Sequence, residues 1–254
     1  MKIVVLAKQV PDTYGERDLD PTTGRIDRMS ADVVIDEICE RALEAALAHK
    51  DETDTEVVLM TMGPADATTM LRRGLAIGAD SAVHIVDDAL AGADMLRTSA
   101  VLASALEREG FDLVITGNES TDGRGGAMAA MLSERLGLPH ATYLNTVEIK
   151  GNTVSGERAG EDNTRTIRAT LPAIISVTER MPEARFPTFK GSMRAKKKPI
   201  KTLTLAELPV PALTAQSVVI STSQRPPRQA GTKIIDDGSA ATQLVDFLTS
   251  SRLI

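Results

Sequence analysis

A glycine-rich segment near the middle of the chain has the residue types that could hold a phosphate group. It reads Gly117-Asn-Glu-Ser-Thr-Asp-Gly-Arg-Gly-Gly126. Its four glycines let the backbone approach a phosphate closely, and the hydroxyl groups of Ser120 and Thr121 add donors. The segment matches neither G-x-G-x-x-G nor the P-loop motif. The spacing alone therefore leaves open that these glycines only make a turn.

A second segment places scarce aromatic rings beside positive charge. Two of the four Phe residues, Phe186 and Phe189, lie close together and are surrounded by proline and glycine. That composition predicts a loop rather than a helix or a central strand. An exposed ring with cationic neighbours is typical of a protein-docking site, although a Phe can also fold back into the core. In this segment, residues 177–200, a run of positive charge follows the rings: Lys190, Arg194, Lys196, Lys197 and Lys198.

Other common site chemistries find no support in the sequence. His49, His84 and His140 are far apart and show no ligand spacing, so we expect no metal site. Neither G-x-S-x-G nor H-E-x-x-H occurs. The single cysteine, Cys39, excludes an internal disulfide and is expected to be a buried small side chain rather than a catalytic thiol.

Composition narrows the class of protein further. The chain has 254 residues, of which 42% are apolar and only 2% aromatic, and a formal net charge of -6. An acidic chain disfavours general nucleic-acid binding. No apolar run approaches the length of a transmembrane helix, and the apolar N-terminus is expected to form a first strand rather than a signal peptide. With one cysteine, a reducing compartment is expected, and we predict a cytoplasmic location.

Short apolar runs alternate with helical patterns over the first 136 residues. This alternation predicts an α/β fold with an open, mainly parallel, doubly wound sheet. Asp36 is placed to cap the first helix, and the glycine-rich segment joins the fourth strand to a helix whose first N–H groups favour an anion. The expected strands are 3–7, 57–62, 82–86 and 111–116, and the expected helices are 37–49, 65–77, 94–109 and 127–136.

The pattern changes in the second half of the chain. A hairpin around Lys150-Gly-Asn152 and further strands at 166–170 and 173–178 predict an antiparallel extension of the sheet. Prolines then break up the tail, which cannot bury a core by itself and needs a surface to lie on. A short helix is expected at 240–248. The predicted division is an α/β nucleotide-binding domain over 1–182, a basic recognition loop over 183–200 and a C-terminal arm over 201–254.

The basic aromatic segment resembles the signature region of electron transfer flavoprotein beta subunits. The matching residues are Phe186-Pro-Thr-Phe189 and Met193-Arg-Ala-Lys-Lys-Lys198, and the resemblance extends over the whole chain. In that family this region is a protruding loop that docks partner dehydrogenases, and its usual Leu anchor falls on Phe189. The resemblance implies docking roles for Phe186, Phe189, Lys190, Met193, Lys196, Lys197 and Lys198.

The resemblance also implies a nucleotide site in this chain. The family's loop holds an adenine nucleotide, usually AMP, and Asp122 falls on the family's aspartate. The run from Gly123 to Ala127 departs from the usual polar sequence, so backbone N–H groups and Arg124 would have to substitute. The stretch from Asp36 to Glu40 lacks the family's Asn-Pro pair. The implied cofactor-binding residues are Leu6, Ala7, Asp36, Cys39, Met62, Gly117, Asn118, Glu119, Ser120, Thr121, Asp122, Gly123, Arg124, Gly125, Gly126, Ala127 and Met128.

For function, the resemblance implies a beta subunit that pairs with an alpha subunit holding most of the FAD. Such a heterodimer carries electrons from acyl-CoA-type dehydrogenases, as in fatty acid oxidation, to a membrane quinone reductase. The chain would be an electron carrier without catalytic residues of its own, because the chemistry is the cofactor's. The tail, with a Pro-Pro element at 224–231, would wrap around the alpha subunit, and Thr13 and Tyr14 are candidates to approach the flavin.

Two alternatives stay open. The electron-bifurcating branch of the family binds a second FAD in the nucleotide site, and Thr121-Asp-Gly123 is the part of its motif found here. A stand-alone adenine-nucleotide-binding protein of the stress-response type would use the same architecture without a partner subunit, and fold analogy cannot separate the two.

Overall fold

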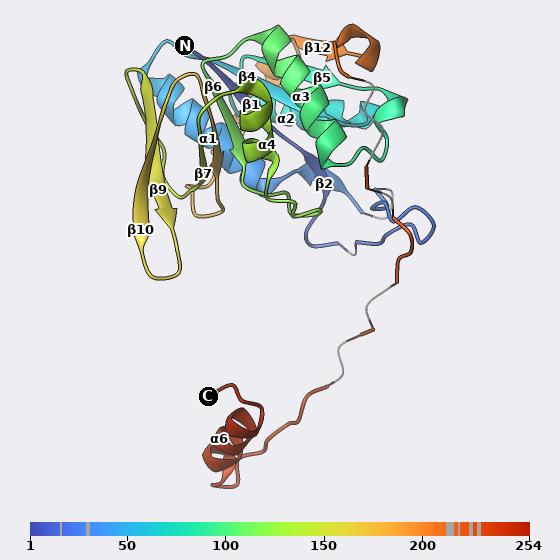
Figure 1. Cartoon of the computed structure of the whole chain (residues 1–254), viewed down its shortest axis with the longest axis vertical. Coiled ribbons are helices and arrows are strands. Elements are labelled where there is room, and N and C mark those ends of the chain that lie inside the picture. Colours follow the sequence, from blue (N-terminus) through green and yellow to red (C-terminus); the bar gives the residue numbers. More distant parts are fainter. Residues whose placement is uncertain (16, 29–30, 212–215, 218, 224–225, 228–229) are drawn as a thin grey trace. The chain divides into compact units, whose positions relative to one another are not determined.

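The central element is a seven-stranded sheet in which every neighbouring pair of strands is parallel (Figure 1). The computed structural model describes residues 1–15, 17–28, 31–211, 216–217, 219–223, 226–227 and 230–254. The strand order is β12-β5-β4-β1-β6-β11-β7, so the predicted α/β class is confirmed. The strands are β1 (Lys2–Leu6), β4 (Glu56–Met62), β5 (Ser81–Ile85), β6 (Leu113–Gly117), β7 (His140–Leu144), β11 (Ala173–Val177) and β12 (Ile200–Leu203).

Two helical layers bury the two faces of this sheet. Alternate residues of β1 belong to separate core clusters: Ile3 and Val5 pack with α1 and α2, whereas Val4 and Leu6 pack with α3 and α4. Both faces are therefore dry, which explains why the strands read as continuous apolar runs. The helices are α1 (Glu37–Glu52), α2 (Thr68–Ile77), α3 (Met95–Glu109) and α4 (Met128–Leu136), and short 3₁₀ turns occupy Ala65–Ala67, Asp88–Leu90 and Leu205–Glu207.

The strand order reverses at the centre of the sheet. From β1 the chain proceeds outward on one side to β4 and β5, and it then returns to place β6 against the other side of β1. In open parallel sheets a ligand crevice lies at such a reversal, outside the carboxyl ends of the strands. The segment after β1 and the glycine-rich segment after β6 both lie at that edge.

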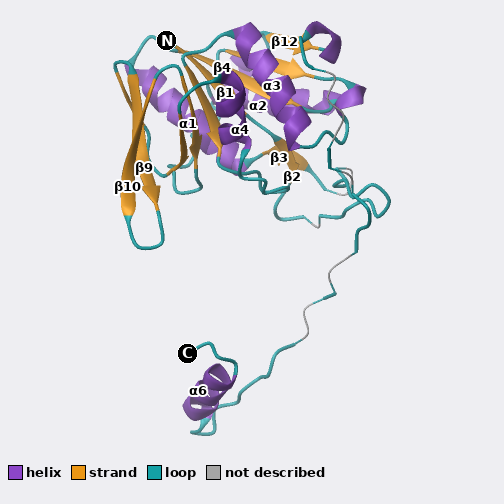
Figure 2. Ribbon diagram, in the orientation of Figure 1, coloured by secondary structure: helices purple, strands orange, loops and turns teal. Residues whose placement is uncertain are grey.

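The antiparallel part of the fold is a separate sheet. Strands β8 (Glu148–Lys150), β9 (Thr153–Ala159) and β10 (Thr164–Thr170) pair in the order β10-β9-β8, and Figure 2 shows β9 and β10 as a projecting ribbon. A two-stranded sheet of β2 (Gln9–Pro11) and β3 (Val33–Ile35) precedes α1. The segment 173–178 was expected to join the antiparallel part. It instead forms β11 between β6 and β7, because its five residues are buried on both faces.

The basic aromatic segment contains a helix, contrary to the expected loop. Helix α5 (Phe189–Ala195) begins after Thr188, whose hydroxyl accepts a hydrogen bond from the N–H of Gly191 at 2.9 Å. Pro182 and Pro187 precede this N-cap and Pro199 follows the helix, so no proline interrupts it. Gly191 lies inside it because a Cβ there would stand 2.4 Å from the carbonyl oxygen of Ala76. Its role is close packing on α2.

The chain after residue 200 divides into two parts. Residues 200–203, assigned in part to the predicted arm, form the edge strand β12 beside β5, and Leu203 and Leu208 are buried in the core. One compact unit spans Met1–Ser221 and a second spans Thr222–Ile254. The second contains α6 (Ala240–Ser250), which has no buried residue. Residues 224–225 and 228–229 of the predicted Pro-Pro element lie outside the described residues.

Among the helices of the described part of the chain, none has the length and apolar character needed to cross a bilayer.

Candidate functional site

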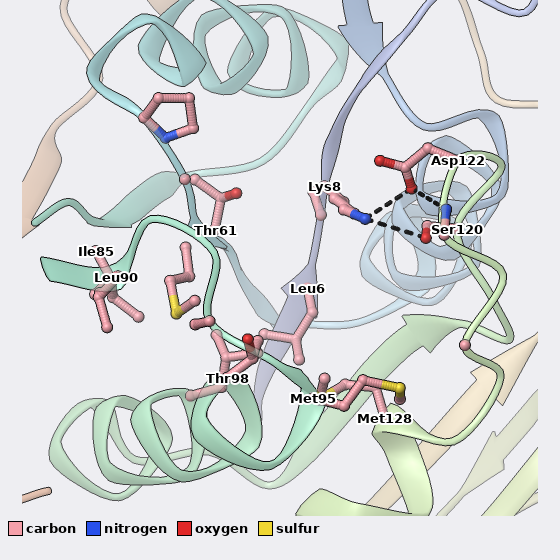
Figure 3. Close-up of a pocket in the computed structure, with 18 of the residues that line it drawn as sticks. Leu6, Lys8, Thr61, Ile85, Leu90, Met95, Thr98, Ser120, Asp122 and Met128 are labelled. Atoms are coloured by element: carbon pink, nitrogen blue, oxygen red, sulfur yellow. Dashed lines mark hydrogen bonds and ion pairs between the residues drawn. The ribbon is translucent and has the colours of Figure 1, made fainter. Parts of the chain in front are cut away.

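A cavity of about 730 Å³ lies at the carboxyl ends of β1, β4, β5 and β6. Lys8, Ser120 and Asp122 lie together on one side of it, Met95 and Met128 lie together on a second, and Leu90 lies beside Ile85 on a third (Figure 3). Its size is in the usual range of about 300–1,000 Å³ for small-molecule pockets. The cavity brings together most of the residues expected to bind a nucleotide: Leu6, Ala7, Cys39, Met62, Gly117, Asn118, Glu119, Ser120, Asp122, Gly123, Gly125, Gly126 and Met128.

Four other expected residues do not line the cavity: Asp36, Thr121, Arg124 and Ala127. Asp36 and Thr121 support it from behind. One carboxylate oxygen of Asp36 accepts from the N–H of Ile38 and so caps α1, and the other accepts from the N–H and the hydroxyl of Thr121 at 2.7 and 2.8 Å. Asp36 is fully buried. It therefore fixes the glycine-rich segment to the start of α1.

Lys8 connects the end of β1 to the same segment. Its Nζ donates to Oδ1 of Asp122 at 2.7 Å and to the hydroxyl of Ser120 at 3.2 Å, and an Arg28 nitrogen lies 3.9 Å from Oδ2 of Asp122. Burial of Asp122 opposes its ionisation, but the hydrogen bond and charge of Lys8, with bonds from Ser120 and Gly123, hold the pKa of Asp122 below its usual value. The side chain of Asp122 is only 5% exposed, so its negative charge depends on Lys8.

Replacing Lys8 with Met is expected to destabilise the fold and to alter its response to acid. A buried acceptor that loses its charged donor costs about 1–3 kcal/mol. Because the folded pKa of Asp122 is low, its stabilisation is complete above the ordinary Asp pKa near 3.9 and is lost as the pH falls through the folded pKa. In Lys8→Met, the free energy of unfolding should therefore fall less between pH 7 and pH 3 than it does in the unaltered chain. Chemical unfolding at several pH values in this range measures the difference.

The control is Lys150→Met, which removes an ion pair to Glu148 between two exposed side chains. Exposed pairs contribute about 0–1 kcal/mol, so this variant should unfold like the unaltered chain. Equal unfolding free energies for Lys8→Met and Lys150→Met would contradict the role assigned to Lys8.

Three cationic residues of the cavity wall were missed by sequence reasoning: Lys8, Arg25 and Arg28. The position of Lys8, immediately after the first strand, was an available signal. Arg25 and Arg28 come from the long polar loop after β2. A guanidinium nitrogen of Arg25 donates to the carbonyl oxygen of Ala91 at 3.0 Å, and Arg28 donates to the carbonyl oxygen of Gln9 at 2.8 Å. No motif or periodicity in the sequence near Arg25 and Arg28 predicts these contacts.

The glycines of the segment serve different purposes. A Cβ on Gly125 would stand 2.6 Å from the sulfur of Met95, and one on Gly126 would stand 2.6 Å from the hydroxyl of Tyr143. These two glycines permit close packing of the segment against protein side chains. Gly123 is different, because its Cβ would lie in ordinary contact, 3.6 Å from Ser120 Oγ and 3.8 Å from Lys8 Nζ. At Gly123 the backbone of the segment therefore lies next to the ammonium group of Lys8.

Two polar groups of the cavity wall have no hydrogen-bond partner within the described residues. They are the hydroxyl of Thr61 on β4 and the side-chain carbonyl oxygen of Asn118, which follows β6. Thr61 is 1% exposed, and buried polar atoms of native proteins are normally satisfied. A polar ligand in the cavity would supply the missing partners.

Cys39 lies at the base of the cavity and is 6% exposed. Burial, with the nearby charge of Asp36, raises the pKa of its thiol to about 12. The thiol therefore stays protonated at neutral pH and is unreactive, as expected from the sequence.

The expected docking residues lie on the surface around α5. Phe186 and Phe189 are 84% and 86% exposed, and Met193, Lys190, Lys196 and Lys197 are exposed as well. Lys198 differs, because its Nζ donates to the carbonyl oxygens of Leu75 and Ala79 at the end of α2. Burial lowers its pKa. Lys198 is thus committed to a helix end and is not available to a partner.

The long loop after β2 carries the two residues expected to approach the flavin. Thr13 and Tyr14 are both exposed, and Tyr14 is 98% exposed. Their approach to the flavin stays a prediction.

Comparison with known protein families gives one match. The model of the electron transfer flavoprotein domain matches residues 23–208. The match includes the glycine-rich segment, most of the cavity wall and α5. It covers well over half of the chain, so it applies to the fold as a whole.

Three relatives show a match over nearly the whole of both chains. The chain is 46% identical to the electron transfer flavoprotein subunit beta of Mycobacterium bovis, over 99% of each chain. It is 32% identical to the protein of the same description from Megasphaera elsdenii, over 100% of each chain. It is also 34% identical to the caffeyl-CoA reductase-Etf complex subunit CarD of Acetobacterium woodii, over 98% of this chain and 97% of that one.

Proposed function

The chain belongs to the electron transfer flavoproteins as a beta subunit, an electron carrier rather than an enzyme, and from this we propose how it works. It pairs with an alpha subunit that holds most of the FAD, and it binds AMP in the cavity at the carboxyl ends of its strands. The heterodimer takes electrons from acyl-CoA-type dehydrogenases, which dock on α5, and passes them to a membrane quinone reductase. A cytoplasmic location, expected from the unpaired Cys39, is part of the proposal.

The observation that carries the nucleotide proposal is the composition of the cavity. Its apolar wall, with Leu90, Met95 and Met128, suits a flat heteroaromatic base, because thioethers make favourable contacts with rings. The unpartnered oxygens of Thr61 and Asn118 suit the polar edge of that base. Lys8 and Arg28 share the one carboxylate of Asp122, and Arg25 donates to a backbone carbonyl oxygen, so these three cations together leave positive charge for a phosphate.

A graded pair of substitutions at Gly123 tests this site. Gly123→Ala should be tolerated, since its Cβ meets ordinary contact distances. Gly123→Val places branched methyl groups beside Lys8 and Ser120, where the phosphate would lie, and should reduce bound nucleotide by about tenfold or more. Nucleotides released from the purified heterodimer by denaturation are identified and counted by mass spectrometry.

Three results of that measurement are distinguishable. One AMP and one FAD in the unaltered heterodimer, with loss of AMP alone in Gly123→Val, supports the proposal. FAD without AMP in the unaltered protein rejects the AMP site. Two FAD per heterodimer would identify the second candidate, a bifurcating flavoprotein. That candidate is favoured by the relative described as part of a caffeyl-CoA reductase-Etf complex and by Thr121-Asp-Gly123 in the glycine-rich segment.

A further inference from the structure

A second cavity, of about 360 Å³, lies beside the exposed helix α5. It is formed where α5 and its N-cap lie over the ends of α1 and α2. Its cationic residues outnumber its acidic ones by four to one, on a chain whose formal net charge is -6. The residues that line it are Lys50, Ala76, Ile77, Gly78, Asp80, Thr188, Lys190, Gly191, Arg194 and Lys198.

Two of the four cationic side chains already bind other groups of the chain. Lys50 forms an ion pair with Asp80, the only carboxylate of the wall, and Lys198 donates to the carbonyl oxygens at the end of α2. Lys190 and Arg194 are exposed, and their side chains have no hydrogen-bond or ion-pair partner within the part of the chain that the structure describes. The cavity therefore keeps two free cations and has no carboxylate left to neutralise them.

These two free cations lie on one face of α5. Lys190 and Arg194 are four residues apart, which places them one above the other on the helix. Phe189 and Met193 are also four apart and form an adjacent apolar stripe, exposed by 86% and 53%. The helix thus presents an apolar stripe and a basic pair next to each other, and the basic pair borders the cavity.

We propose that this cavity receives a carboxylate side chain, Asp or Glu, of the dehydrogenase that docks on α5. This inference rests on the proposed function, and it adds that the docking surface of the dehydrogenase carries an acidic side chain. A partner that seats Phe189 in an apolar pocket necessarily brings its neighbouring residues over Lys190, the next residue of the helix. An Arg guanidinium and a Lys ammonium bind a carboxylate by charge-assisted hydrogen bonds, so the partner should carry an acidic residue beside its apolar pocket.

The wall of the cavity is fixed before a partner arrives. Gly191 packs against the carbonyl oxygen of Ala76, and Thr188 caps the helix. Arg72 donates from α2 to the carbonyl oxygens of Ala195 and Lys198, both at 2.7 Å. Because little backbone order has to be gained on binding, the site loses little affinity to that ordering.

The test compares two pairs of substitutions that remove the same charge from the same segment. Lys190→Gln with Arg194→Gln empties the cavity of its free cations, whereas Lys196→Gln with Lys197→Gln removes exposed cations that do not line it. The probe is an acyl-CoA dehydrogenase that reduces the unaltered heterodimer. The first pair should raise the KM for the heterodimer about tenfold or more without lowering kcat, and the second pair by no more than about threefold.

A second measurement locates the carboxylate directly. A carbodiimide joins a carboxylate to a neighbouring lysine amine with loss of water, and the joined peptides are identified by mass spectrometry. Amide formation at Lys190 in the complex with the dehydrogenase supports the inference. Equal KM increases for both pairs, or joined peptides at Lys196 and Lys197 alone, overturn it and leave the proposed function standing. If no acyl-CoA dehydrogenase reduces the unaltered heterodimer, the proposed function fails, and this inference fails with it.

Discussion

Phe189→Ala is expected to weaken dehydrogenase docking by roughly thirtyfold or more while leaving the melting temperature unchanged. An aromatic anchor buried at an interface contributes about 2 kcal/mol or more, which corresponds to that factor in affinity. In the free chain Phe189 is 86% exposed at the first residue of α5. It fills no part of the core, so the cavity cost of about 3–5 kcal/mol for a buried Phe does not apply.

The measurement pairs the melting temperature with dehydrogenase-dependent reduction of the heterodimer on the same variant. Leu96→Ala serves as the control, because Leu96 is also an exposed apolar side chain but lies on α3 and lines neither cavity. It should leave dehydrogenase docking intact. Retained docking in Phe189→Ala, or equal losses in both variants, would show that α5 does not carry the anchor.

The parts of the fold that follow local rules were predictable from the sequence. The strands of the central sheet are buried on both faces and therefore appear as short apolar runs, and Asp36 stands where a helix cap was expected. The sheet membership of β11 was not predictable, since an apolar run does not say which strand it pairs with. Helix α5 was not predicted because its prolines lie outside it: Pro182 and Pro187 precede the N-cap at Thr188, and Pro199 follows the last helical residue.

The candidate site was predictable in position but not in detail. The glycine-rich segment and the strand ends come together in one cavity, as parallel topology requires. The contact of Lys8 with Asp122 joins residues 114 positions apart in the sequence, and a local sequence pattern cannot predict a contact over that separation. The same limit affected Lys198, which belongs to a run of three lysines in the sequence but caps α2 in the fold.

Removal of the second unit is expected to have the largest effect on assembly. A chain ending at Ser221 keeps the whole first unit, including Leu203 and Leu208, which are buried in its core. An earlier stop after Glu207 would remove Leu208 and mix a folding defect with a binding defect. The chain that ends at Ser221 should therefore fold with a nearly unchanged melting temperature, because it keeps these buried residues.

Assembly with the alpha subunit should nevertheless be lost in this truncated chain. Helix α6 has no buried residue, and three of its apolar side chains, Leu244, Val245 and Phe247, are about half exposed. An amphipathic helix of this length is marginal in water by itself, so its apolar face needs a partner's surface. Size-exclusion chromatography of the co-expressed subunits, with flavin absorbance as the second readout, should show separate chains in place of a yellow heterodimer.

The double substitution Leu244→Asp with Phe247→Asp in the full chain should give the same result, because each carboxylate would have to be buried unpaired. A stable yellow heterodimer from the truncated chain would show that the alpha subunit is held by the first unit instead.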